Sequence, residues 1–149
     1  LAQEMDTLEL PELVEGLGAP VAVSIGNPHC VFFVDDAETF DFRPIGKEIE
    51  HHPLYPNRTN VQFVTPTGPG SIRQRVWERG VGVTGASGSG ACAGAVAALR
   101  RGLVTGPVTV QLDGGELVID WDQQANQIWM TGSATFAFDG MLSAELLND

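Results

Sequence analysis

The sequence is poor in basic residues. Eight lysines and arginines stand against 19 acidic residues, which gives the 149-residue chain a formal net charge of −11. A surface of this sign repels phosphate backbones, so we expect no nucleic-acid partner. Such a charge is typical of a soluble protein. An anionic substrate remains compatible with it where a pocket supplies hydrogen-bond donors.

Cysteines and histidines are also few. Cys30 and Cys92 form neither a disulfide framework nor a zinc-binding pattern, which indicates a reducing, cytoplasmic compartment. The histidines, His29, His51 and His52, do not stand at metal-ligand spacing with acids or thiols. The sequence therefore predicts no metal site.

Signals for membranes and secretion are missing as well. No apolar run approaches the roughly 18 residues that span a bilayer, so we expect no membrane contact. The acidic start, "LAQEMDTLEL", lacks the basic-then-apolar pattern of a secretion signal. Because the chain starts with Leu1 rather than methionine, we expect a fragment or a processed chain.

What the sequence does have is a series of β-rich runs separated by turn residues, with 43% hydrophobic residues in all. No linker or low-complexity segment divides it, so we predict a single domain over residues 1–149. The predicted strands cover 20–26, 29–36, 59–67, 71–80, 107–112, 116–121, 127–132 and 134–140, with short helices at 43–51 and 141–147.

A further helix is predicted after the run "TGASGSG". Every residue from Gly90 to Leu99 is Gly, Ala, Cys, Val or Leu, and a helix that is apolar all round is normally covered on all sides. Arg100 and Arg101 suit the last turn of a helix, and Gly102 suits its C-terminal cap. We therefore predict an α+β fold in which a β-barrel-like mixed sheet wraps around one buried central helix.

The glycine-serine run before this helix has three interpretations. In the simplest, the glycines allow close packing and the serines cap the helix. A nucleotide site is suggested by the GxGxxG pattern at 80–85. However, the helix starts too late for that fingerprint, and residues 99–112 contain no acid to bind a ribose. A P-loop would need a lysine, which this stretch lacks.

The third interpretation is a carboxylate-binding site. Backbone N–H groups at a buried helix start bind anions, and Gly88, Ser89 and Gly90 would supply them here. Glu78 and Arg79 end the preceding strand with opposite charges. Together they could hold a zwitterionic amino acid, Glu78 taking the ammonium group. A surface ion pair is the alternative for these two residues.

Polar side chains also stand at two strand starts. "GNPH" places Asn27 and His29 beside one strand, and "NRTN" places Asn60 at another. Asparagine is equally typical of turns, and His29 of a histidine satisfied within the core.

Four segments in order, "GNPHCV", "YPNRTNVQFV", "RVWERGVGVTGASGSGACAGAVAA" and "MTGSATFAFDG", resemble the C-terminal half of diaminopimelate epimerase over about residues 20–140. The resemblance implies a cofactor-independent isomerase of bacterial lysine and cell-wall biosynthesis. It also implies two similar domains, each a barrel-like sheet around a helix, that close over an amino diacid. In this family one cysteine thiolate removes the α-proton while a second thiol delivers a proton to the opposite face.

The resemblance assigns roles to individual residues. Backbone groups of Gly88 and Ser89 would cradle the reacting carboxylate, and His29 would help tune a catalytic thiol, a role that Glu78 could share. The family's second catalytic cysteine corresponds to Ser87, whose hydroxyl is a poor base at neutral pH. The side chains that would contact the substrate are Asn27, Asn60, Glu78 and Arg79.

Two further departures concern activity. In the milder one, Val83 replaces an acid common in the family. Cys92, five residues beyond Ser87, does not restore the missing thiol, because we expect a buried structural thiol there. The first catalytic cysteine belongs to the N-terminal domain, which this chain lacks. We therefore expect the chain alone to be inactive.

The resemblance also bears on assembly, and two other functions remain open. Family members dimerise through the C-terminal region, where Phe138 occupies the place of an aromatic residue, so a homodimer is expected. The first alternative function is a related isomerase or dehydratase of another amino or carboxylic acid. The second is a non-catalytic domain that binds amino acids.

Overall fold

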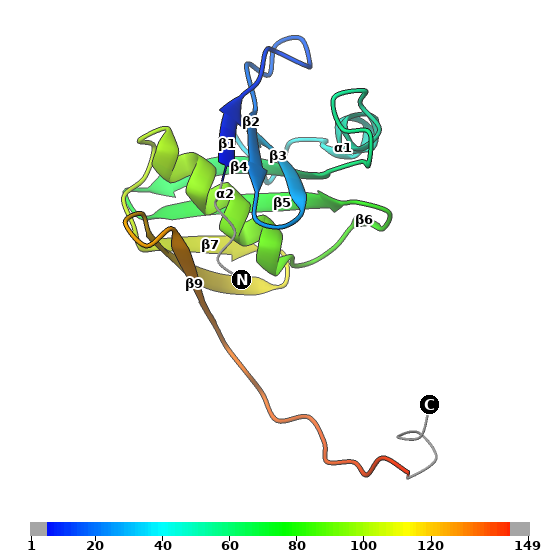
Figure 1. Ribbon diagram of the computed structural model, residues 1–149, viewed down its shortest axis with the longest axis vertical. Helices are drawn as coiled ribbons and strands as arrows, with labels where there is room; N and C mark the ends of the chain where they lie inside the picture. The colour runs from blue at the N-terminus through cyan, green and yellow to red at the C-terminus, as the bar shows by residue number, and fades with distance from the viewer. Residues whose placement is uncertain (1–5, 144–149) are drawn as a thin grey trace.

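The computed structural model describes residues 6–143, in which one curled sheet carries a helix on each face (Figure 1). The helices are α1 (Arg43–Glu50) and α2 (Gly88–Arg100). The strands are β1 (Asp6–Glu9), β2 (Val21–Ser24), β3 (Pro28–Phe33), β4 (Asn60–Gly68), β5 (Ser71–Glu78), β6 (Gly82–Val83), β7 (Val108–Leu112), β8 (Gly115–Asp122) and β9 (Gln127–Gly132).

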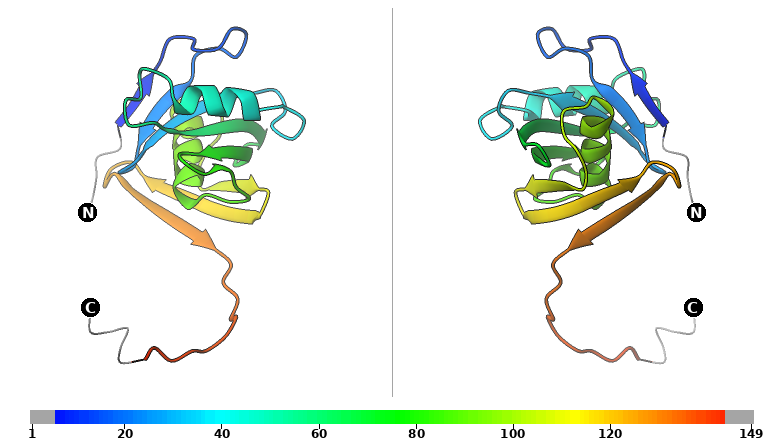
Figure 2. Two further views of the ribbon diagram at one scale, coloured as in Figure 1. Left: turned by 90° about the vertical axis from the view of Figure 1, so that its right-hand side faces the viewer. Right: turned by 90° about the vertical axis from the view of Figure 1, so that its left-hand side faces the viewer.

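The sheet follows the order β1-β2-β3-β4-β5-β7-β8-β9, with β6 paired to β5 off this path. Neighbouring strands are antiparallel except for two parallel pairs, β3 with β4 and β5 with β7. A parallel pair needs a crossover connection, and each crossover here contains one helix, α1 in the first and α2 in the second. The sheet curls around α2, as the views in Figure 2 show. The α+β class and the sheet wrapped around a central helix are therefore confirmed.

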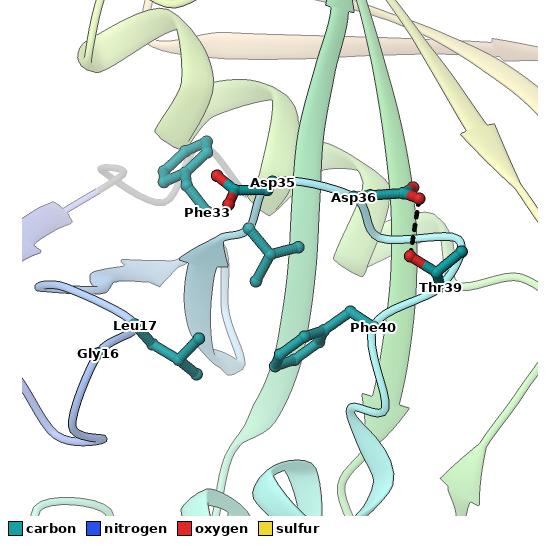
Figure 3. Close-up of a pocket in the computed structure, with 8 residues that line it drawn as sticks. Gly16, Leu17, Phe33, Asp35, Asp36, Thr39 and Phe40 are labelled. Carbon is teal, nitrogen blue, oxygen red and sulfur yellow. Dashed lines mark hydrogen bonds between the residues drawn. The ribbon is translucent and has the colours of Figure 1, made fainter.

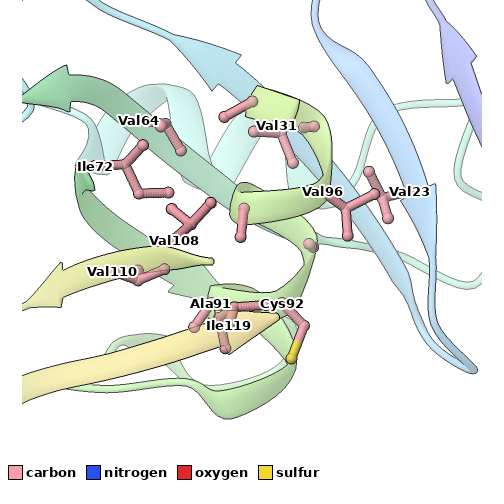
Figure 4. Close-up of a cluster of buried hydrophobic side chains, with 14 of the residues drawn as sticks. Val23, Val31, Val64, Ile72, Ala91, Cys92, Val96, Val108, Val110 and Ile119 are labelled. Carbon is pink, nitrogen blue, oxygen red and sulfur yellow. The ribbon is translucent and has the colours of Figure 1, made fainter. Parts of the chain in front are cut away.

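The larger core lies between α2 and the concave face of the sheet (Figure 4). Val31, Val64, Ile72, Val108 and Ile119 come from five different strands, and all are fully buried in it. They pack on an α2 whose residues from 90 to 98 are all buried, as its all-round apolar composition predicts. The prediction of a covered central helix is confirmed.

A second core lies on the other face of the sheet, under α1. Phe32 and Phe63 stack with ring centroids 5.6 Å apart, and Phe42 and Ile49 pack against them from the α1 segment. Residues alternate between the cores along β4: Val61 and Phe63 face α1, whereas Val64 faces α2. The central strands are therefore buried on both faces, and the loops of the candidate site lie at their ends.

Two predicted elements turn out differently, and two short strands, β1 and β6, were not predicted. Residues 6–9 form an unpredicted strand, because "DTLE" has no apolar pattern and is ordered by pairing with β2. The strand predicted at 134–140 is wrong. Residues 133–143 leave the sheet after β9 and have no regular structure (Figure 1). The helix predicted at 141–147 does not form over 141–143, and its remainder lies outside the described residues. Within the described chain, neither helix has the length and apolarity needed to cross a bilayer.

Candidate active site at the start of helix α2

Ser87 begins α2 as its N-terminal cap. Its backbone is extended (φ −145°, ψ 113°), and its Oγ accepts a hydrogen bond from the Gly90 amide at 3.3 Å. The Ser87 hydroxyl donates to Glu78 Oε2, also at 3.3 Å. The amide of Gly90, expected above to help bind an anion, is therefore satisfied by Ser87. The amides of Gly88 and Ser89 belong to the same first turn, where N–H groups have no acceptor within the helix.

Asn27 links the first turn of α2 to strand β3. It lies in the bend between β2 and β3 and donates from Nδ2 to Ser89 Oγ at 3.3 Å. Its Oδ1 lies 3.0 Å from His29 Nε2, so this imidazole nitrogen carries the proton and donates it. His29 has no exposed surface. Asn27, His29 and Ser89 thus form one hydrogen-bonded unit.

Asn60 performs the same linking role on the next strand. It is directly opposite His29 in the parallel register of β3 and β4, and it is 5% exposed. Its Nδ2 donates to the carbonyl oxygen of Pro28 at 3.0 Å, and its Oδ1 accepts from the Arg79 amide at 3.0 Å. Asn60 therefore ties the "GNPH" bend to the end of β5.

Glu78 and Arg79 occupy the tight turn after β5. Glu78 pairs with Gly82 across this turn, and its Oε1 accepts a hydrogen bond from the Thr84 hydroxyl. Its other carboxylate oxygen faces Ser87, as described above. The Arg79 guanidinium donates to the backbone oxygen of Asn57 at 3.3 Å. The Glu78 carboxylate thus lies at the start of α2, whereas the guanidinium of its neighbour Arg79 is bonded to the segment that precedes β4.

The imidazole of His29 is uncharged at neutral pH. Burial lowers the pKa of His29 to about 4. The Gln62 side chain opposes this effect, and the positive charge of Arg79 adds to it. A neutral His29 orients Asn27 through a hydrogen bond, and it carries no positive charge with which to stabilise a nearby anion.

Neither cysteine is poised for chemistry. Burial raises the pKa of Cys30 to about 12 and that of Cys92 to about 11. Both thiols are therefore protonated at neutral pH, and both are buried. Cys92 packs in the core around α2, which confirms that this thiol is buried.

The structure brings the sequence-predicted residues together. Hydrogen bonds link Asn27 to His29 and Ser89, Asn60 to Arg79, and Glu78 to Ser87. Sequence reasoning missed Met130 of β9, which lies next to Gly88: a Cβ on Gly88 would stand 3.3 Å from the Met130 sulfur. No sequence signal identifies this contact, because it depends on the pairing of β9 with β8. Among residues 6–143, no group of three or more His, Cys, Asp or Glu side chains could hold a metal ion.

A cavity of about 280 Å³ lies at the far end of β3 from Asn27 and His29 (Figure 3). Its lining comes from the Gly16–Leu17 loop and from the segment between Phe33 and Phe40. Asp36 is engaged in its own turn, where it accepts from the Thr39 hydroxyl at 2.7 Å and from the Glu38 amide at 2.9 Å. None of the residues predicted for the site lines this cavity.

Comparison with known proteins shows which family this chain resembles. The sequence profile of the diaminopimelate epimerase family matches residues 21–137. A diaminopimelate epimerase from Erythrobacter litoralis is 51% identical over 140 residues, covering 94% of this chain and 52% of that protein. One from Desulfitobacterium hafniense is 50% identical over 127 residues (85% and 44%), and one from Rhodospirillum centenum 48% over 147 residues (99% and 50%). The chain spans about half the length of these curated relatives.

Solved structures support the fold. A phenazine biosynthesis protein of the PhzF family from Enterococcus faecalis superposes with a TM-score of 0.51 at 13% identity, covering 81% of this chain and 42% of that one. At this identity the likeness concerns the fold alone.

Proposed function

Because this chain belongs to the diaminopimelate epimerase family, we propose that it supplies half of the active site of a cofactor-independent epimerase. The reaction is the conversion of LL-diaminopimelate to meso-diaminopimelate, a cytoplasmic step of lysine and peptidoglycan precursor biosynthesis. The observation that carries the proposal is the convergence of Asn27, Asn60, Glu78 and Ser87 at the start of one buried helix.

The first turn of α2 suits the reacting carboxylate of the substrate. The amides of Gly88 and Ser89 carry the partial positive charge of a helix start, which stabilises the negative charge that develops when the α-proton leaves. Glu78, whose carboxylate lies beside Ser87, and Arg79 offer opposite charges to the ammonium and carboxylate groups of the amino diacid. Asn27 ties the start of α2 to β3, and Asn60 ties the bend before β3 to the Glu78–Arg79 turn, so the two asparagines together fix these parts relative to one another.

The proposed chemistry needs a second half of the site. One base removes the α-proton and an acid on the opposite face returns one, since a single base would restore the original configuration. We assign one face to position 87 and the other to an N-terminal domain outside this chain. The apolar residues that follow β9 support a partner surface of this kind: Phe136 is 76% exposed and Phe138 80% exposed. A second copy of the chain is the other candidate for the surface at Phe138.

Ser87 decides how much activity to expect. A hydroxyl is several pKa units less acidic than a thiol, so Ser87 does not exchange protons readily at neutral pH. We therefore expect a protein with Ser87 to bind the diacid and to epimerise it poorly or not at all. The hydrogen bonds of Ser87 to Gly90 and Glu78 equally support the second candidate, a non-catalytic domain that binds amino acids. A related isomerase or dehydratase of another acid is the third.

The test is incorporation of solvent deuterium at the α-carbon of diaminopimelate. The protein is the two-domain form in which this chain is the C-terminal half, once with Ser87 and once with Ser87→Cys. Exchange and epimerisation in the cysteine form alone would support the proposal. If neither form exchanges the proton although both bind the diacid in calorimetry, the binding domain is favoured. Turnover of another acid by the serine form would favour the divergent enzyme.

A further inference from the structure

Glu50 is a buried carboxylate with no role in the site described above. It is the last residue of α1 and only 3% exposed. Its Oε2 accepts a hydrogen bond from the Trp77 indole at 2.7 Å, and its Oε1 accepts one from the Gly80 amide at 2.8 Å. These two donors flank Glu78 and Arg79 on either side.

From this arrangement we infer that Glu50 is a positioning residue that holds the Glu78–Arg79 turn against the start of α2. The inference rests on the proposed function, because Glu78 and Arg79 matter to a substrate only if this is the substrate site. Glu50 itself belongs to the opposite face of the sheet and touches neither the α2 amides nor Ser87. Glu50 acts through the Trp77 indole and the Gly80 amide, which lie on either side of the charged residues Glu78 and Arg79.

The turn depends on such an anchor because its own bonding is slight. Gly80 has a left-handed backbone (φ 77°), and β6, which closes the turn, is two residues long. The Arg79 amide is held by Asn60 and the next amide, that of Gly80, by Glu50. Two consecutive amides are therefore fixed by two side chains from different elements.

Helix α1 is seated so that Glu50 reaches this turn. A Cβ on Gly46 would stand 2.7 Å from the Trp77 Cβ, so only glycine lets the helix lie directly on the indole. Arg58 lies 3.6 Å from Glu50 Oε1, with its own backbone in the left-handed region (φ 62°). Burial alone would raise the pKa of Glu50. The bonds from Trp77 and Gly80, with the charges of His51 and Arg58, outweigh burial and lower that pKa. Glu50 is therefore ionised and is a strong acceptor at neutral pH.

The first test measures hydrogen exchange in this chain by NMR. Glu50→Gln keeps the volume but leaves one acceptor oxygen for two donors. We expect the Gly80 amide or the Trp77 indole N–H to exchange about tenfold faster, as the loss of one charge-assisted hydrogen bond implies. Buried amides of α2 should keep their rates. Glu48→Gln, which removes the same charge from an exposed position of the same helix, is the matched control. If both protons keep wild-type rates in Glu50→Gln, the inference is overturned.

The second test uses the two-domain protein carrying Ser87→Cys as its reference. A displaced turn weakens substrate binding, so Glu50→Gln should raise KM about tenfold and leave kcat within about threefold. A merely structural loss would lower the active fraction, and hence kcat, at unchanged KM; that result would overturn the inference, as would unchanged kinetics. If the reference itself shows no turnover, the proposed function fails, and the exchange rates still decide whether Glu50 holds the turn.

Discussion

Gly94 offers a sharp test of how α2 is seated in the sheet, because two physical effects predict opposite outcomes for Gly94→Ala. Glycine within a helix is about 1 kcal/mol less favourable than alanine, so helix propensity alone predicts a more stable protein. Packing predicts the reverse. A Cβ at position 94 would stand 1.9 Å from Gln74 Oε1, 3.0 Å from its Cδ and 3.4 Å from Val64 Cγ2.

The size of the clash decides the sign. Real Cβ atoms essentially never approach closer than 3.0 Å, so the amide of Gln74 would have to move by about 1 Å. Gln74 has no exposed surface, and its amide cannot turn into solvent. Overpacking of this kind costs about 1–3 kcal/mol. We expect Gly94→Ala to lower the free energy of unfolding by about 2 kcal/mol, after the gain in propensity is subtracted.

The assay is urea unfolding of the chain followed by tryptophan fluorescence, with the midpoints compared at equal slope. Gly88→Ala is the control. Its new methyl group would meet Met130, whose half-exposed side chain is able to move aside, so little change is expected. In a double-mutant cycle, Gln74→Ala should remove most of the penalty of Gly94→Ala, giving a favourable coupling of about 2 kcal/mol. A Gly94→Ala chain as stable as the wild type, or more stable, would refute the conclusion that α2 packs too closely on Gln74 to admit a Cβ at position 94.

Three further predictions concern titration and the cap. Because burial holds the pKa of His29 at about 4 against 6.5 for the unfolded chain, stability is complete above pH 6.5 and falls as the pH drops toward 4. Up to about 3 kcal/mol should be lost over this range. His29→Asn should flatten the unfolding free energy over that range, and an unchanged pH dependence would contradict the assignment. Cys30 and Cys92, whose pKa values burial raises to about 12 and 11, should resist a thiol reagent at pH 8 until urea unfolds the chain; labelling in native buffer would count against their burial. Ser87→Cys should cost about 1 kcal/mol in urea unfolding, because sulfur is a weaker acceptor for the Gly90 amide, and a gain in stability would argue against the cap.

Composition and local pattern were enough to predict the parts of the fold that depend on local physics. A helix that is apolar all round is expected to be covered on all sides by the rest of the fold, and α2 is. The predicted caps are close to the observed ends of α2. The segment at 134–140 marks the limit of that reasoning. Its alternation of small and aromatic residues is typical of a strand, but a strand also needs a partner with free backbone groups. A sequence pattern indicates that a segment can form a strand, but it does not identify the strand with which that segment would pair.

The site shows the same limit. Residue types at strand starts identified Asn27, His29 and Asn60 as candidates, whereas their convergence depends on the parallel register that sets His29 opposite Asn60. That register links segments 31 residues apart through the α1 crossover, and no spacing rule supplies it. The inward position of Glu50 could not be predicted from the sequence, for a related reason. A glutamate at the end of a short helix usually faces solvent, and only the seating of Gly46 on Trp77 turns it inward.

Ser87 belongs both to the cap of α2 and to the proposed active site. The cap observed at Ser87 and the proposed substrate site involve the same atoms, so the two interpretations of the glycine-serine run are compatible. A serine at this position completes the cap, because its Oγ accepts from Gly90 and its hydroxyl donates to Glu78. A thiol there would complete both bonds less well. The helix start would lower its pKa, whereas the Glu78 carboxylate 3.3 Å away would raise it. If position 87 exchanges the proton as proposed, the residue that best stabilises this helix start is not the one that best moves a proton.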